Sequence, residues 1–168
     1  MLGLPPHAPL SAIELAARLD VAVRGLADVP GVGMRELLQL LERDPGSWSA
    51  YTFQVQGRLF VIHNTAHEVA RQESNLMHEL AHLICEHTPR PFVKLDGVNF
   101  PLRTYDEEQE GEASWLGATL QLPRRGLEWA HRQGMSHDEI AEHFGASLPQ
   151  VRYRARMTGI ERQYRRTG

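Results

Sequence analysis

Residues 73–87 read ESNLMHELAHLICEH. Within it, His78, Glu79 and His82 form the pattern H-E-x-x-H. In an α-helix, two histidines four positions apart lie about 40° from each other on one face, so both imidazoles can bind one ion. Glu79 lies beside them, where its carboxylate can take a proton from a water molecule that the ion activates. The stretch therefore predicts a metal site on a helix.

The residues around the motif favour a helix that is largely buried, and buried imidazoles need a partner such as a metal. Apolar residues cover most of its circumference, namely Leu76, Met77, Leu80, Ala81, Leu83, Ile84 and Cys85. The alternative is a chance match, because a five-residue pattern with three fixed residues occurs in many unrelated proteins. A third ligand elsewhere in the chain would favour the metal site.

Catalytic zinc usually has three protein ligands and an open position for water. His87 lies five residues past His82, about 140° further around a continuing helix, so we do not expect it to reach the same ion. A second helix, predicted from Asp106 to Gln121 and ended by Pro123, offers carboxylates instead. The candidates in its first turns are Glu107, Glu108, Glu110 and Glu112.

Glu110 is the preferred third ligand, because Ala113, Ser114 and Gly117 follow it at i+3, i+4 and i+7 on the same stripe. These small residues would let the second helix approach the first. Glu112 is the second choice. For each of these glutamates, a solvated charge at the start of a helix is the alternative.

The rest of the chain predicts an α+β fold that is mostly helical. We expect a helix from Ser11 to Leu19, a strand at 21–26 and a helix at 34–42. Residues 49–55 and 58–63 predict a hairpin with a two-residue turn at Gln56-Gly57. Asn64 and Thr65 are expected to cap the metal-site helix, and residues 88–104 to be irregular. His63 and His67 are interpreted as polar or capping residues, with a ligand role as the alternative.

Composition indicates an ordinary soluble protein of 168 residues, 42% hydrophobic and 23% charged. Its net charge of −3 is unevenly distributed. Residues 1–123 hold 9 Lys and Arg against 16 Asp and Glu, whereas residues 124–168 hold 9 Arg against 5 Asp and Glu. We therefore expect two parts, a metal-binding domain at 1–123 and a helical segment at 124–168.

The single cysteine, Cys85, excludes a disulfide framework and a cysteine-based zinc site, and we expect it to be a small core residue. The start of the chain, MLGLPPHAPL, does not read as a signal peptide, and no apolar run reaches the ~18–20 residues of a membrane span. The protein is predicted to be cytoplasmic.

Residues 136–157 have the pattern of a helix-turn-helix segment. Ser136 and Glu139 form a capping box before the first helix, and Ser147 caps the second. The second helix carries Arg152, Arg154 and Arg156, which could contact DNA phosphates. Packing against the rest of the protein, or docking of a protein substrate, is the preferred interpretation.

The stretches RQESNLMHELAHLICEH (71–87) and EGEASWLGATLQLP (110–123) resemble the ImmA/IrrE family of metallo-endopeptidases. The resemblance implies a zincin-like peptidase domain with a gluzincin-like site, in which His78, His82 and Glu110 bind Zn²⁺, with Mn²⁺ possible. It also implies that Glu79 is the general base. In zincin peptidases the edge of the sheet can hold an extended substrate by strand addition. The sequence departs from the family pattern at four positions, where Phe, Thr, Asn and Leu are usual: Ser74, Asn75, Ser114 and Gln121.

The resemblance implies a protein substrate, a helix-turn-helix transcriptional repressor that is cut in response to DNA damage or to control a prophage or mobile element. Tyr105 is a candidate donor to the oxyanion that forms during peptide hydrolysis, with simple packing as the alternative. Two other hypotheses stay open. One is a non-catalytic metal-binding regulator that binds a repressor or DNA, and the other is a structural helix bundle without metal.

Overall fold

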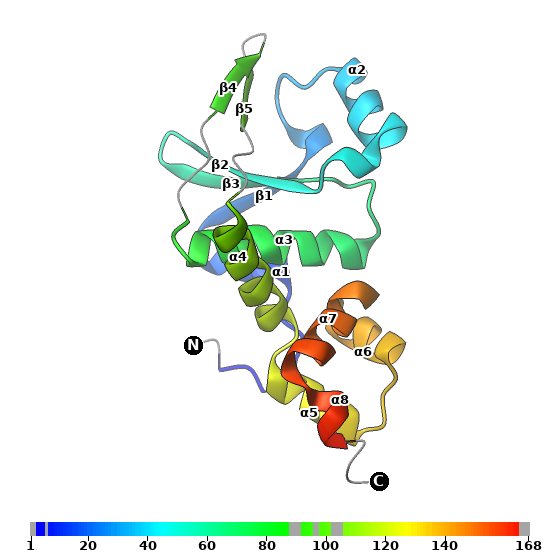
Figure 1. The fold of residues 1–168 in the computed structure, drawn as a ribbon. Helices are drawn as coiled ribbons and strands as arrows, with labels where there is room; N and C mark the ends of the chain where they lie inside the picture. The colour runs from blue at the N-terminus through cyan, green and yellow to red at the C-terminus, as the bar shows by residue number, and fades with distance from the viewer. Residues whose placement is uncertain (1–2, 6, 88–91, 96–97, 102–105, 165–168) are drawn as a thin grey trace.

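A three-stranded sheet lies against the helix that carries the H-E-x-x-H motif (Figure 1). The computed structural model describes residues 3–5, 7–87, 92–95, 98–101 and 106–164. The strands are β1 (Val21–Gly25), β2 (Ala50–Val55) and β3 (Arg58–His63), in the order β1-β3-β2. The central strand β3 pairs in parallel with β1 and antiparallel with β2. Strand β2 is therefore an edge of this sheet.

The predicted hairpin is confirmed, with Val55 opposite Arg58 as its last pair. The two residues between the strands, Gln56 and Gly57, have φ values of 50° and 80°. Positive φ at both central positions is what a two-residue turn with the native strand twist requires.

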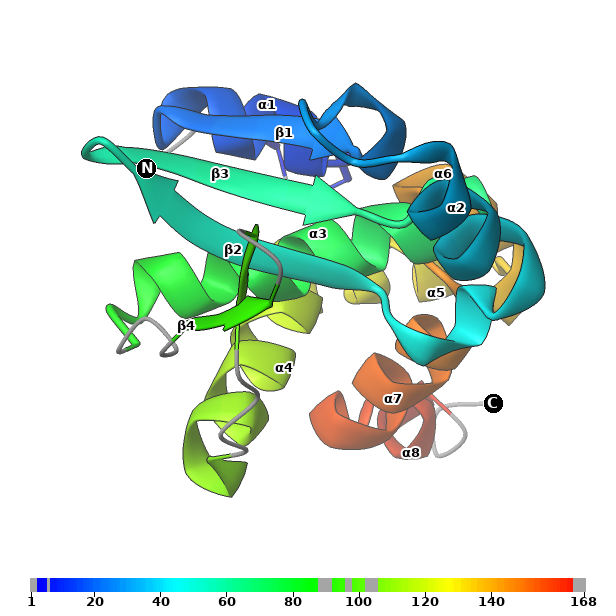
Figure 2. The same cartoon turned by 90° about the horizontal axis from the view of Figure 1, so that it is seen from above.

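Helix α1 (Ala12–Arg18) and helix α3 (Val69–Ile84) pack on the same face of the sheet (Figures 1 and 2). Helix α3 contributes Leu76, Met77 and Leu80 to the core, each at most 2% exposed. The Glu73 side chain of α3 accepts a hydrogen bond from the backbone N–H of Ala12, the first residue of α1. This contact joins the two helices. It also satisfies a backbone N–H at the start of α1 that has no partner within that helix.

The predicted cap of α3 is wrong, since the helix begins at Val69 with Glu68 at its N-cap position. Asn64 is instead fully buried, and its side-chain amide donates to the carbonyls of Pro45 and Trp48 at 2.8 and 3.2 Å. It holds the loop before β2 in place, because a buried amide needs such partners.

Two other predicted segments differ from the structure. The expected helix at 34–42 is a short α2 (Met34–Leu37) that continues as a π-helix, η2 (Leu38–Arg43). The segment expected to be irregular contains an antiparallel hairpin of β4 (Phe92–Leu95) and β5 (Val98–Pro101). Prolines in this segment favour an irregular conformation, but Pro101 forms the terminal pair with Phe92. A strand tolerates a missing N–H at that position. The short helices η1 (Leu26–Asp28) and η3 (Pro45–Ser47) complete this part.

Helix α4 (Glu107–Gln121) crosses α3 at very short distance. A Cβ atom at Gly117 would lie 2.9 Å from the Met77 carbonyl oxygen and 3.0 Å from the His78 backbone nitrogen. Ala113 and Ala118 on either side are also buried. The predicted small-residue stripe thus forms the contact, and only glycine fits at its centre. Asp106 caps the helix by accepting from the backbone N–H groups of Glu108 and Gln109.

The last helices lie together in the C-terminal part of the chain (Figure 1). Their buried residues form a second core, from Leu122 to Ile160. They are α5 (Arg124–Arg132), α6 (His137–Phe144), α7 (Leu148–Thr158) and α8 (Ile160–Tyr164). The predicted helix-turn-helix pattern is α6 and α7, with the expected capping box of Ser136 and Glu139 and a left-handed Gly145 at φ 60°. The boundary at residue 123 between two domains stays a prediction. In the described part of the chain, no helix has both the length and the apolar character that crossing a membrane requires.

The expectation that three arginines of α7 could face DNA is wrong for Arg154. Its side chain is buried, and its Nε donates to the Leu122 carbonyl at 3.1 Å. Burial lowers the pKa of this guanidinium from its ordinary value. Arg154 therefore joins α7 to the end of α4, whereas Arg152 and Arg156 are exposed.

We predict that Gly117→Ala destabilises the protein by about 1–3 kcal/mol, because the added methyl group overpacks the contact with the α3 backbone. Gly111→Ala on the same helix is the matched control, since its Cβ would meet no atom within 4 Å. It should stabilise α4 by about 0.5–1 kcal/mol, because alanine favours helix over glycine. Urea unfolding of both variants measures the difference, and equal stability would contradict the tight contact.

Candidate metal centre

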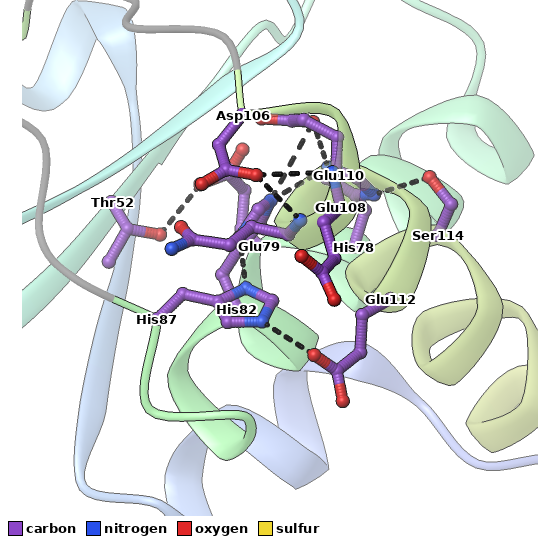
Figure 3. Close-up of polar contacts among 11 residues, drawn as sticks. Thr52, His78, Glu79, His82, His87, Asp106, Glu108, Glu110, Glu112 and Ser114 are labelled. Atoms are coloured by element: carbon purple, nitrogen blue, oxygen red, sulfur yellow. Dashed lines mark hydrogen bonds and ion pairs between the residues drawn. The ribbon is translucent and has the colours of Figure 1, made fainter.

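Two imidazoles of α3 and one carboxylate of α4 converge on one point (Figure 3). The Nε2 atoms of His78 and His82 lie 3.1 Å apart, and Glu110 Oε2 lies 3.2 and 3.7 Å from them. The three side chains are 12–27% exposed, so they are largely shielded but still reach solvent. The structure thus brings together the three residues that the sequence favoured as ligands.

The spacing of these donor atoms fits a metal ion. Donors in a tetrahedral zinc site at about 2.0–2.1 Å from the ion lie roughly 3.3 Å from one another. The three observed separations of 3.1, 3.2 and 3.7 Å are close to that value. Two nitrogen atoms and one carboxylate oxygen are also a usual ligand set for catalytic zinc. That these residues bind a metal stays a prediction.

The other candidate ligands lie elsewhere. Glu112, the second choice, faces His87, with its Oε2 3.1 Å from His87 Nε2. Tyr105 lies outside the described residues. His67 is buried, and its Nε2 lies 2.9 Å from the Pro45 carbonyl oxygen, so it helps to hold the loop before β2. Burial lowers the pKa of His63, which belongs to no cluster of potential metal ligands in the described ranges.

The outer ring nitrogens of the two motif histidines also have partners. His78 Nδ1 lies 3.4 Å from Ser114 Oγ of α4, and His82 Nδ1 lies 2.8 Å from His87 Nδ1. His87 is not one of the three convergent donors, but the expectation that it lies about 140° around a continuing helix is wrong, since its ring contacts that of His82. Helix α3 ends at Ile84, and the chain turns back.

Glu79 points toward the sheet, as Figure 3 shows. Its Oε2 accepts a hydrogen bond of 2.7 Å from the hydroxyl of Thr52, which lies on the edge strand β2. A carboxylate beside the convergent donors and next to an edge strand can act as a base on a molecule bound along that strand. Thr52 was not identified from the sequence, since no local pattern links it to a residue 27 positions away.

A groove of about 1480 Å³ includes His78 in its lining and extends between the two cores. Its lining also includes Asn75 of α3, Ser114 and Ala118 of α4, and Gln150 and Tyr153 of α7. The turn between α6 and α7 and the start of α1, with Ser11 and Glu14, line it as well. The second helical unit therefore supplies one wall of a groove that the candidate ligand His78 also lines.

Two departures from the family pattern, Ser74 and Gln121, meet beside this groove. Their side-chain oxygens lie 3.1 Å apart, so the Ser74 hydroxyl can donate to the amide oxygen of the fully buried Gln121. Gln121 Nε2 donates to the Gly145 carbonyl at 2.9 Å, and the backbone N–H of Ser147 lies 3.3 Å from Ser74 Oγ. These contacts tie α3 and α4 to the turn between α6 and α7.

The chain matches the model of a known protein family. The model of the peptidase M78 family, described as the IrrE N-terminal-like domain, matches residues 38–156. The match includes the H-E-x-x-H motif, Glu110 and nearly all of α7, and covers well over half of the 168 residues. Neither the curated proteins nor the solved structures gave a significant match.

We predict that the protein binds one Zn²⁺ per chain through the three convergent side chains. Glu110→Ala should weaken binding by more than the roughly 10- to 100-fold that loss of an outer-shell partner costs. Competition with a chromogenic chelator measures the affinity. Glu108→Ala, which removes an exposed carboxylate from the same helix, should leave it unchanged. Equal affinities of the two variants would exclude Glu110 as a ligand.

Proposed function

The chain belongs to the peptidase M78 family of IrrE N-terminal-like domains, and from this premise we propose that it is a metal-dependent endopeptidase that cleaves a protein substrate. The convergence of His78, His82 and Glu110 beside Glu79 carries the proposal. The domain is metallopeptidase-like.

His78, His82 and Glu110 would hold the ion, which we propose to be Zn²⁺, with Mn²⁺ as the alternative. When bound, such an ion polarises the scissile carbonyl and lowers the pKa of water. The ligands come from two helices that share one tight contact at Gly117, so their spacing is built into the fold. Side chains that already lie in the binding geometry lose little conformational freedom when the ion binds.

Glu79 would accept a proton from the attacking water and pass it to the leaving amine. Its partner Thr52 supports this role, because the hydroxyl at 2.7 Å fixes the direction of the carboxylate. A base held in one orientation needs no reordering when the substrate arrives. Thr52 also links the base to strand β2, where an extended substrate would bind.

We propose that the substrate chain adds to the edge strand β2 and continues into the groove that includes His78 in its lining. Strand addition uses the backbone groups of an edge strand, and side-chain pockets then supply specificity. In this proposal Tyr153 and Gln150 of α7 contact the substrate on one side of the scissile bond. The substrate itself is proposed to be a helix-turn-helix repressor, as the family resemblance implies.

DNA binding by the C-terminal helices is the weaker alternative. Arg154 is buried and bonded to Leu122, which leaves Arg152 and Arg156 as the exposed arginines of α7. Phosphate contacts contribute to affinity in proportion to their number, and two arginines make a small electrostatic contribution.

We predict that Glu79→Gln lowers the rate of repressor cleavage by about 10²- to 10⁴-fold, because glutamine cannot act as a general base. The assay combines the protein, Zn²⁺ or Mn²⁺, and the repressor encoded beside it, and follows cleavage by mass spectrometry. Metal binding should be unchanged in this variant. An intact repressor at every metal concentration, or full activity of Glu79→Gln, would contradict the proposal.

Thr52→Val should lower kcat by about 10- to 100-fold, since a hydrogen bond to a charged group contributes about 1.5–3 kcal/mol. Valine keeps the shape of threonine and its preference for strands. Thr65→Val is the matched control, because Thr65 is an exposed threonine after β3. Equal loss of activity in both variants would show that the loss does not come from the missing hydrogen bond to Glu79.

Tyr153→Ala should raise KM for the repressor about fivefold or more, which corresponds to about 1 kcal/mol of lost substrate contact. Because Tyr153 lies on α7, kcat for a short peptide and the metal affinity should stay unchanged. Arg152→Ala on the same helix is the control, since Arg152 is exposed and outside the groove lining. An unchanged KM would exclude α7 as a substrate contact.

A further inference from the structure

We propose that His87 and Glu112 form a hydrogen-bonded relay that selects the metal-binding tautomer of His82, so that both are positioning residues for the metal centre. The inference rests on the proposed metal at His78, His82 and Glu110.

The backbone brings His87 back onto His82. After the last residue of α3, Ile84, the chain continues through Cys85 to Glu86, which has φ 54°. The backbone N–H of His87 then donates to the His82 carbonyl at 3.0 Å. A left-handed residue followed by this backward hydrogen bond is the Schellman end of a helix. It returns the chain over the last turn, so the His87 ring meets the His82 ring although the two residues are five positions apart.

The side chains then form an unbroken series of contacts. The Nδ1 atoms of His82 and His87 lie 2.8 Å apart, and His87 Nε2 lies 3.1 Å from Glu112 Oε2. The His87 side chain is 8% exposed, whereas that of Glu112 is 59% exposed. The series thus runs from the metal ligand, through a buried ring, to a carboxylate at the surface.

Only one arrangement of protons satisfies all three groups with both rings neutral. A contact of 2.8 Å between two ring nitrogens needs one hydrogen between them. If that hydrogen is on His82 Nδ1, then His82 Nε2 carries the lone pair that faces His78 and Glu110. His87 then accepts at Nδ1, and its Nε2–H donates to the Glu112 carboxylate.

The opposite arrangement is disfavoured by Glu112. It would put the hydrogen on His87 Nδ1 and leave a bare His87 Nε2 facing the carboxylate, so two acceptors would meet at 3.1 Å. It would also put a hydrogen on His82 Nε2, where the lone pair is needed for a metal. The carboxylate of Glu112 therefore selects the tautomer of His82 from two hydrogen bonds away.

A second metal site is the competing use of the same residues, because Cys85, His87 and Glu112 offer donor atoms within 4.8 Å of one another. Both ring nitrogens of His87 already have partners in the relay. Burial and the charge of Glu112 raise the pKa of the Cys85 thiol, which disfavours the thiolate that binds metals. The relay accounts for these contacts without a second ion.

The test measures Zn²⁺ affinity of the full-length protein by competition with a chelator, together with urea unfolding of the metal-free protein. Glu112→Gln and His87→Ala should each weaken Zn²⁺ binding about 10- to 100-fold, as loss of an outer-shell partner does. His87→Asn should fall between His87→Ala and the unchanged protein, because the asparagine oxygen can replace Nδ1 as the acceptor. Glu107→Gln, which removes an exposed charge from the same helix, should leave the affinity unchanged.

Two results would overturn the relay. One is an unchanged Zn²⁺ affinity in Glu112→Gln and His87→Ala, with His82→Ala losing the metal; the metal centre would then stand without the relay. The other is binding of two Co²⁺ ions per chain with a thiolate-to-cobalt absorption band that Cys85→Ser abolishes, which would assign these residues to a second site. If every variant kept its metal, His82→Ala included, the metal centre itself would be refuted. If metal-free His87→Ala and His87→Asn are equally stable, the difference in their Zn²⁺ affinities does not come from a difference in folding.

Discussion

The close contact of α3 with α4 is the constraint on which the candidate site depends. Two of its three donor atoms come from α3 and the third from α4, so the separation of the helices sets the separation of the donors. At the contact, a side chain on Gly117 would meet backbone atoms of Met77 and His78, which cannot move aside independently of their helix. The backbone nitrogen that Gly117 approaches belongs to a candidate ligand. Packing in the core and spacing in the site are therefore the same geometric requirement.

The other parts of the site come from elements that this helix pair brings together. Strand β2 supplies Thr52, which orients the Glu79 carboxylate, and the Schellman end of α3 returns His87 to His82. Each motif residue thus has a contact outside the motif. The Glu79 carboxylate is held by a side chain of the sheet. His82 is held by His87 after the end of α3, and His78 by Ser114 of the packed helix α4. Such contacts reduce the freedom of the side chains before any ligand binds.

The C-terminal helices are integrated with the metallopeptidase-like domain through polar contacts at its edge. Ser74 and Gln121 meet each other and the turn between α6 and α7, and Arg154 binds the carbonyl at the end of α4. A buried glutamine and a buried arginine need these partners, because an unsatisfied polar group in the interior costs about 1–3 kcal/mol. The helix-turn-helix pattern here has an architectural role, since it forms one wall of the groove that includes His78.

The sequence by itself determined the features that depend on local periodicity and on turn chemistry. The spacing of His78 and His82 on one helix face, the two-residue turn at Gln56-Gly57 and the small residues around Gly117 all follow from short-range geometry. Only the tertiary structure decided the contacts between distant elements. Thr52 lies 27 positions before Glu79, and Glu112 lies 25 positions after His87. The Arg154 side chain points inward, where it donates to the Leu122 carbonyl at the end of α4. Helical periodicity also failed for His87, because the helix ends before it and a left-handed Glu86 reverses the chain.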